Sequence, residues 1–93
     1  MGNRLGRASG LIKAKSEMDE TLDLRGLKCP LPALMTRRAL ARLPRGALLT
    51  VTADDPLAAV DIPHMCHQEG HAVESVTRQD DHVRFELCAG GAA

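Results

Sequence analysis

Aromatic side chains are almost absent from this sequence of 93 residues: Phe85 is the only one, and there is no tryptophan or tyrosine. Stacking on nucleobases therefore has hardly any side chain to rely on. The 12 basic residues are balanced by 12 acidic ones, so the net positive charge typical of proteins that bind phosphate backbones is missing as well. We expect no direct binding to nucleic acid.

Long hydrophobic runs and paired cysteines are also missing. No apolar stretch reaches the roughly 20 residues that a membrane-spanning helix needs, so we expect no membrane partner. The three cysteines are an odd number without a close pairing pattern, which is typical of reduced thiols in the cytoplasm rather than of a disulfide framework. The sequence therefore predicts a cytoplasmic protein, and we expect a monomer.

Residues 1–18 differ in composition from the rest of the chain. They are rich in glycine and basic residues, and no acidic residue precedes Glu17. We predict a disordered extension here; an organellar transit peptide has a similar composition and is the alternative. Residues 19–90 are long enough for one small domain with one modest core, and residues 91–93 are predicted to be a disordered tail.

The hydrophobic pattern predicts the element order βαβαββ, with a first helix over residues 30–43. Pro63 argues against one unbroken second helix, so we predict a short turn at 57–60 and then a new helix that Asp61 caps and Gly70 ends. One sheet face is polar, which predicts an α/β (α+β) two-layer sandwich with a four-stranded mixed sheet and two helices on one face. The expected strands are 21–25, 47–53, 72–78 and 82–88.

The stretch Cys29-Pro30-Leu31-Pro32 is the most informative part of the chain. Proline suits the first helical turn, where a missing N–H costs nothing, so Pro30 and Pro32 are expected to position the cysteine sulfur. At a helix N-terminus the unsatisfied N–H groups and the macrodipole favour an anion. We therefore predict a lowered pKa and a reactive thiolate at Cys29, with a buried structural cysteine as the alternative.

The predicted first helix has two different faces. The residues expected to face the sheet are Met35, Ala39, Leu40 and Leu43. The residues expected on the exposed face are Leu34, Arg37, Arg38 and Arg42. An exposed leucine among cations beside a reactive thiol is typical of a docking surface for an acidic partner, and an ordinary solvated helix face is the alternative.

Two other groups of side chains are expected to be structural. Asp54 and Asp55 directly precede Pro56, and we interpret them as a cap and a turn rather than as an acid/base pair. Cys66 and Cys88 are expected to be small core residues.

Three histidines and a cysteine could form a zinc site at the end of the second helix: His64, Cys66, His67 and His71. Gly70 is predicted to end the helix before His71, which breaks the geometry that zinc needs. We therefore expect no metal and no other cofactor, and we expect the histidines on the surface. A small zinc-binding module stays as an alternative.

The residues above resemble a known family, the TusA (SirA-like) sulfur carriers. Residues 22–32 are similar to the N-terminal signature of that family, whose hallmark is Cys-Pro-x-Pro. Residues 53–56 together with Asp61-Ile62-Pro63 and Cys66 are similar to its second conserved segment. The similarity covers residues 19 to about 90, and it implies the same βαβαββ sandwich.

The resemblance also implies an activity, a sulfurtransferase-type relay rather than stand-alone catalysis. Cys29 matches the carrier cysteine, which receives sulfane sulfur as a persulfide from a cysteine desulfurase and passes it to a downstream acceptor protein. Leu34, Arg37 and Arg38 match the helix positions that the family uses to bind partners. A regulatory or interaction module of the same fold, without sulfur chemistry, is the alternative.

The resemblance leaves the pathway open. In the best-known branch the sulfur ends in the 2-thio group of a tRNA wobble uridine, but Leu31 stands where that branch often has an acidic residue. Asp55 and Asp61 match acidic positions of the family, and we expect them to be structural caps.

Overall fold

The structure is a computed structural model that describes residues 18–91. The predicted extension, apart from Met18, and residues 92–93 of the predicted tail lie outside the described residues. Neither helix of the described part is long and apolar enough to span a bilayer. The elements follow in the predicted order: β2 (Glu20–Asp23), α1 (Leu31–Arg42), β3 (Leu48–Ala53), α2 (Ala58–Glu69), β4 (Ala72–Arg78) and β5 (Val83–Cys88).

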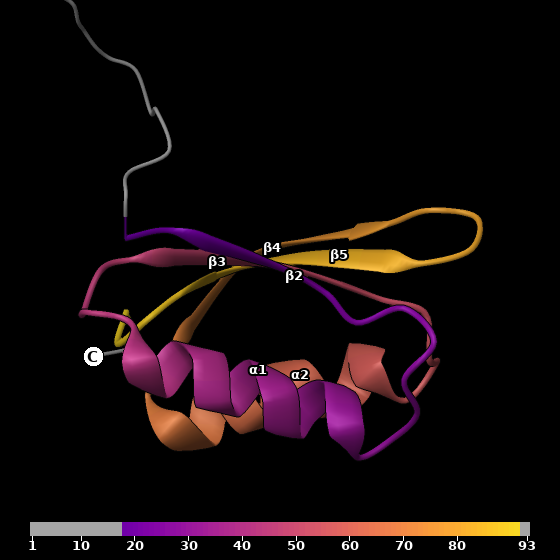
Figure 1. Ribbon diagram of the computed structural model, residues 1–93, viewed down its shortest axis with the longest axis horizontal. Coiled ribbons are helices and arrows are strands. Elements are labelled where there is room, and N and C mark those ends of the chain that lie inside the picture. Colours follow the sequence, from indigo (N-terminus) through magenta and orange to yellow (C-terminus); the bar gives the residue numbers. More distant parts are fainter. Residues whose placement is uncertain (1–17, 92–93) are drawn as a thin grey trace, which may run out of the picture.

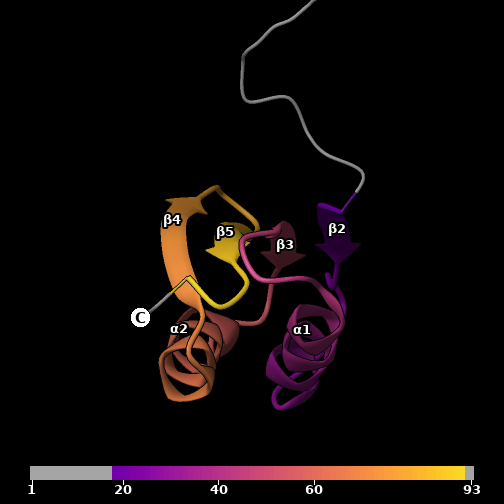
Figure 2. The same cartoon turned by 90° about the vertical axis from the view of Figure 1, so that its left-hand side faces the viewer.

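The four strands form one mixed sheet in the order β2-β3-β5-β4. β2 is parallel to β3, and β5 is antiparallel to both β3 and β4. Both helices cover the same face of the sheet (Figures 1 and 2), α1 on the β2–β3 side and α2 on the β4–β5 side. The predicted fold class is therefore confirmed: an α/β two-layer sandwich with two helices on one face.

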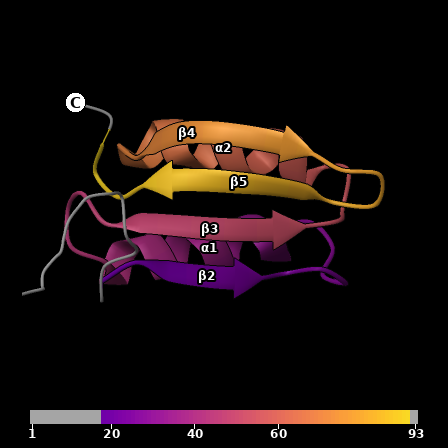
Figure 3. The ribbon, with the colours of Figure 1, turned by 90° about the horizontal axis from the view of Figure 1, so that it is seen from above.

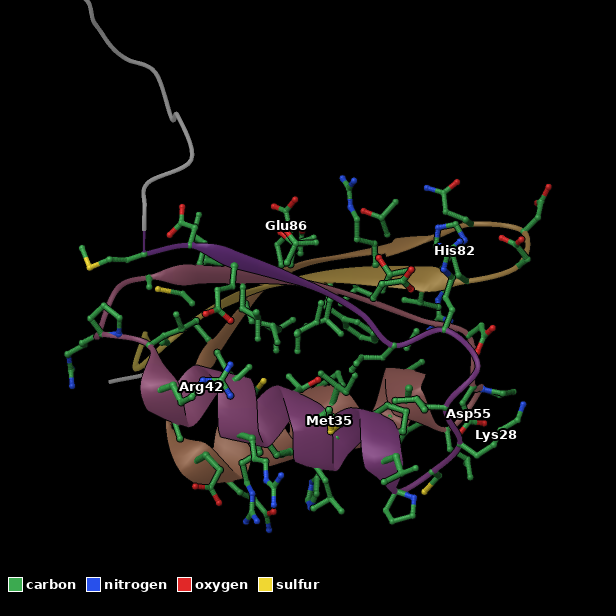
Figure 4. All side chains as sticks on the ribbon, in the orientation of Figure 1. Lys28, Met35, Arg42, Asp55, His82 and Glu86 are labelled. Carbon is green, nitrogen blue, oxygen red and sulfur yellow. The ribbon has the colours of Figure 1, made fainter. Side chains whose placement is uncertain are left out.

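The core lies between the sheet and the helices. Leu49 and Val51 of β3 and Phe85 and Leu87 of β5 are fully buried, because alternate residues of a strand point to the same face. Their neighbours in the two strands point to the open face, where Glu86 stands above the sheet (Figure 4). The predicted alternation in these two strands is confirmed.

The two cysteines outside the Cys-Pro-x-Pro stretch have different environments. Cys66 of α2 is fully buried, as predicted. Cys88 is only half-buried, because the alternation that turns Leu87 inward turns Cys88 toward the open face. The prediction of a core position is therefore wrong for Cys88.

The face of α1 that meets the sheet is rotated from the predicted one. Met35 is 40% exposed, so its predicted core position is wrong. Thr36 lies inward instead, because its hydroxyl donates a hydrogen bond to the Pro32 carbonyl oxygen at 2.7 Å and so stays partnered when buried. The buried residues of α1 are Pro32, Thr36, Ala39 and Leu40.

The second helix runs without interruption from Ala58 to Glu69, so the predicted turn at 57–60 and the predicted helix start at Asp61 are wrong. A proline inside a helix removes one hydrogen bond, but α2 buries one face against the core, and such packing outweighs the local preference. Asp61 lies in the first turn and is not the cap. The helix does end at Gly70, whose φ of 83° is left-handed, as predicted.

The rotated face of α1 can be tested by comparing two substitutions on the same helix. Leu40→Ala should lower the free energy of unfolding by about 2–5 kcal/mol, the usual cost of truncating a fully buried leucine. Met35→Ala should cost less than about 1 kcal/mol because its side chain is largely in solvent. Urea denaturation followed by circular dichroism measures both. Equal losses would contradict the assigned face.

Candidate functional site

The loops that follow β2 and β3 meet at one end of the molecule. Because the two strands are parallel neighbours, both chains leave the sheet at the same edge (Figure 3). The Leu24 N–H extends the pairing by donating to the Thr52 carbonyl oxygen at 2.7 Å. Residues 24–30 therefore lie against residues 54–57, and Lys28 and Asp55 mark this end in Figure 4.

Two adjacent aspartates hold the backbone of the cysteine loop. Asp54 Oδ1 accepts the Gly26 N–H at 2.9 Å, and Asp55 Oδ2 accepts the Cys29 N–H at 2.6 Å. A charged acceptor makes such bonds stronger than neutral ones, and Asp55 is only 9% exposed. Neither side chain caps α2, whose N-cap Leu57 makes no side-chain cap bond. The predicted cap role of this pair is therefore wrong, and the two aspartates position Cys29.

The sulfur of Cys29 is exposed and faces a third carboxylate. Its Sγ donates a hydrogen bond to Oδ2 of Asp61 at 3.0 Å. This bond, together with partial desolvation and the negative charges of Asp61 and Asp55, raises the pKa of the Cys29 thiol above its ordinary value. The predicted lowering of this pKa is wrong, and so is the prediction that Asp61 is only a structural cap.

The N-terminus of α1 does not compensate for these charges, because the sulfur does not cap the helix. The N-cap is Pro30, and there is no side-chain cap bond. Of the first helical residues, Leu31 donates its N–H to the Lys28 carbonyl oxygen at 2.8 Å, and Pro32 has no N–H to offer. Pro30 is exposed and Pro32 is buried, and their role in positioning the sulfur stays a prediction.

The predicted docking residues lie on the outer face of α1. Leu34 is 43% exposed, and Arg37 and Arg38 are exposed as well. The start of α2 adds apolar surface that was not predicted, since Leu57 is 55% and Val60 is 65% exposed. Leu57 and Val60 lie four residues and one residue before Asp61, which contacts the Cys29 sulfur.

The alternative zinc cluster is not assembled. Within residues 18–91, no group of three or more His, Cys, Asp or Glu side chains is placed to hold a metal ion. Cys66 is buried in the core, while His64 and His67 are exposed. His71 is half-buried, and its Nδ1 accepts the Gly90 N–H at 2.8 Å. His71 is therefore not the free surface residue that was predicted.

The chain is similar to several known proteins. The model of a family described as sulfurtransferase TusA matches residues 20–88. The chain belongs to the TusA family. Two relatives of this TusA-family chain come from Neisseria meningitidis, one from serogroup A (serotype 4A) and one from serogroup B. Each is 48% identical over 61 residues, which is 66% of this chain and 82% of the relative, and each carries the provisional name of sulfur carrier protein.

A solved structure shares the fold. The crystal structure of a SirA-like protein from Desulfitobacterium hafniense superposes with a TM-score of 0.67 and 26% identity, covering 76% of this chain and 97% of that one. The predicted TusA (SirA-like) family is therefore confirmed. Membership in a family of sulfur carriers implies that the protein interacts with both a sulfur-donating and a sulfur-accepting protein.

The environments of the cysteines predict an order of reactivity. Iodoacetamide at neutral pH should modify Cys29 before Cys66, because burial excludes the reagent from Cys66 and raises the pKa of its thiol to about 11. Because the pKa of Cys29 is raised, its rate should still increase above pH about 8.5, where an ordinary thiol is half ionised. Peptide mapping over a pH series measures both rates. Complete labelling at mildly acidic pH would contradict the raised pKa.

Proposed function

We propose that this TusA-family protein carries sulfane sulfur as a persulfide on Cys29, receiving it from a cysteine desulfurase and passing it to an acceptor protein. The observation that supports this most is the exposed Cys29 sulfur on a backbone that Asp54 and Asp55 hold in place. An exposed sulfur can reach the active site of a partner, and a fixed backbone presents it in the same position at each encounter.

The proposed exchange balances without a cofactor. The Cys29 sulfur loses its proton and attacks the outer sulfur of the donor persulfide. A new S–S bond forms, the donor S–S bond breaks, and the inner donor sulfur leaves with the electron pair and takes up a proton. The acceptor thiolate then attacks the outer sulfur on Cys29 in the same way. Net oxidation is zero, so no cofactor is assigned.

The outer face of α1 is the proposed partner-binding surface. Leu34 supplies apolar contact near the sulfur, and Arg37 and Arg38 supply positive charge for an acidic partner. The exposed Leu57 and Val60 add apolar surface at the start of α2, the helix whose Asp61 contacts the sulfur. We propose residues 19–90 as the unit that carries out the relay, and the cytoplasm as its place.

For the destination of the sulfur we propose tRNA 2-thiouridine synthesis, through an acceptor protein. This follows the branch that the family resemblance suggested, although Leu31 stands where that branch often has an acidic residue. Mass spectrometry of tRNA nucleosides from a strain that lacks the protein tests the proposal. Unchanged 2-thiouridine would assign the carrier to another sulfur pathway.

Cys29 should be the only cysteine that accepts sulfur. Incubated with a cysteine desulfurase and free cysteine, the protein should gain the mass of one sulfur atom, which a reductant removes. Cys29→Ser should abolish this gain without unfolding the domain, because the side chain is exposed and a hydroxyl can also donate to Asp61. Intact-mass spectrometry measures the gain.

The other two cysteines provide the controls for that experiment. Cys66→Ala and Cys88→Ala should both keep the modification, with a larger loss of stability for the fully buried Cys66. Sulfur that maps to either of these residues, or that persists in Cys29→Ser, would show that the proposed relay is wrong.

A glutamate introduced on the outer face of α1 should slow the loading of Cys29 with sulfur without affecting the fold. Arg37→Glu or Leu34→Glu should change the free energy of unfolding by no more than about 0.5 kcal/mol, because both side chains are exposed. Loading from the desulfurase should slow roughly five- to ten-fold, the effect of losing about 1 kcal/mol of contact. Arg84→Glu, on the open face of the sheet, is the matched control and should load normally. A large loss of stability would place these residues in the core instead.

A further inference from the structure

Two carboxylates contact Cys29. Asp61 of α2 accepts its S–H, and Asp55 of the preceding loop accepts the N–H of the same residue. The charges that raise the pKa of its thiol are those of Asp61 and Asp55, both negative. Neither carboxylate forms an ion pair with any residue between 18 and 91, although Lys28 directly precedes Cys29. Asp61 is therefore a half-buried carboxylate whose contact is a thiol rather than a cation.

We propose that Asp61 holds Cys29 in its protonated, weakly nucleophilic form while the carrier is free, and that a partner activates the sulfur by placing a cationic side chain against this carboxylate. The inference rests on the proposed function of Cys29 as the sulfur carrier. It assigns Asp61 to the regulation of that site and states the chemistry of the partner group, an arginine or a lysine near the reacting sulfur.

The physical reason is the hydrogen bond itself. A carboxylate that accepts an S–H stabilises the thiol, and its charge disfavours the thiolate, which is the species that attacks sulfur. A cation that pairs with Asp61 withdraws the acceptor and cancels the charge, so the thiolate fraction rises only in the complex. In the free carrier the same contact protects Cys29 from oxidants, which also react with the thiolate.

The surface around Asp61 shows how a partner could reach it. Asp61 follows the exposed Val60 in the first turn of α2, and Leu57 at the start of the helix is exposed too. A partner that covers these two side chains brings its own residues to the carboxylate and excludes water there, which strengthens an ion pair. Arginine suits the site well because its guanidinium can bind both carboxylate oxygens.

Two thiol reagents of opposite charge test whether the site favours a cation. Aminoethyl and sulfonatoethyl methanethiosulfonate carry the same reactive group, so their rates at Cys29 differ mainly through charge. At low ionic strength the cationic reagent should react faster, by roughly five-fold for each unit of reagent charge. Asp61→Asn should remove most of this preference. Asp80→Asn, which loses the same charge in the exposed turn between β4 and β5, should keep it. Equal preference in wild type and Asp61→Asn would overturn the proposal.

The pH dependence of alkylation gives a second readout. With iodoacetamide, Asp61→Asn should move the half-maximal rate at Cys29 to lower pH, because the group that favours the protonated thiol has lost its charge. Asp61→Glu should stay closer to wild type. Circular dichroism checks that each variant is folded. A profile of Asp61→Asn that superposes on the wild type would overturn the role of Asp61.

Loading with glutathione persulfide separates this inference from the proposed function. Faster loading of Asp61→Asn than of wild type at neutral pH supports the protective role of Asp61. Equal or slower loading overturns that role while Cys29 stays the carrier. If wild-type Cys29 takes up no sulfur even from a cysteine desulfurase although the reagent preference is present, the carrier function is wrong, and activation by a partner falls with it.

Discussion

The parallel pairing of β2 with β3 is the interaction on which the reactive end of this protein depends. It sends the chain after each strand to the same edge of the sheet, so that Asp54 and Asp55 reach the N–H groups of Gly26 and Cys29. A register slip of one residue in β3 would turn its buried side chains out of the core. The burial that fixes the register therefore also fixes the position of the carboxylates, and the site takes its geometry from the core.

The protonation of the sulfur is decided by a neighbouring helix rather than by its own. The positive end of a helix dipole is worth about half an elementary charge, and its effect is strongest on a group that caps the helix. Asp61 carries a full negative charge, and its Oδ2 lies 3.0 Å from the Cys29 sulfur. The full charge at hydrogen-bond distance outweighs the half charge of the helix end. The pKa of a cysteine that directly precedes a helix is therefore lowered only when no negative charge from another part of the fold lies close to its sulfur.

Sequence reasoning succeeded where a short repeat governs the structure and failed where distant residues meet. The alternation along β3 and β5 and the stop at Gly70 are local, and so is the motif that singles out Cys29. The choice of Thr36 over Met35 for the core was missed because the two lie on adjacent parts of the helix, and a local hydrogen bond decides between them. The contacts of Asp55 and Asp61 with Cys29 span 26 and 32 residues, so rules for caps gave the wrong role. The predicted βαβ order of the first two strands held the missing clue, because a helical connection joins parallel strands, and the carboxyl ends of neighbouring parallel strands lie together.

The zero net charge of the chain conceals a separation of charge that suits a relay. Arg37 and Arg38 make the outer face of α1 basic, whereas the loop end around Cys29 is acidic. Complementary charge fixes how a partner approaches and increases the rate of encounter more than it increases affinity. Exposed charges are also screened over about 8 Å at physiological salt, so they hold a complex only at close contact. A protein that must dissociate from its donor before it binds its acceptor needs orientation without tight binding. The exposed charges of this surface orient the partner and add little affinity.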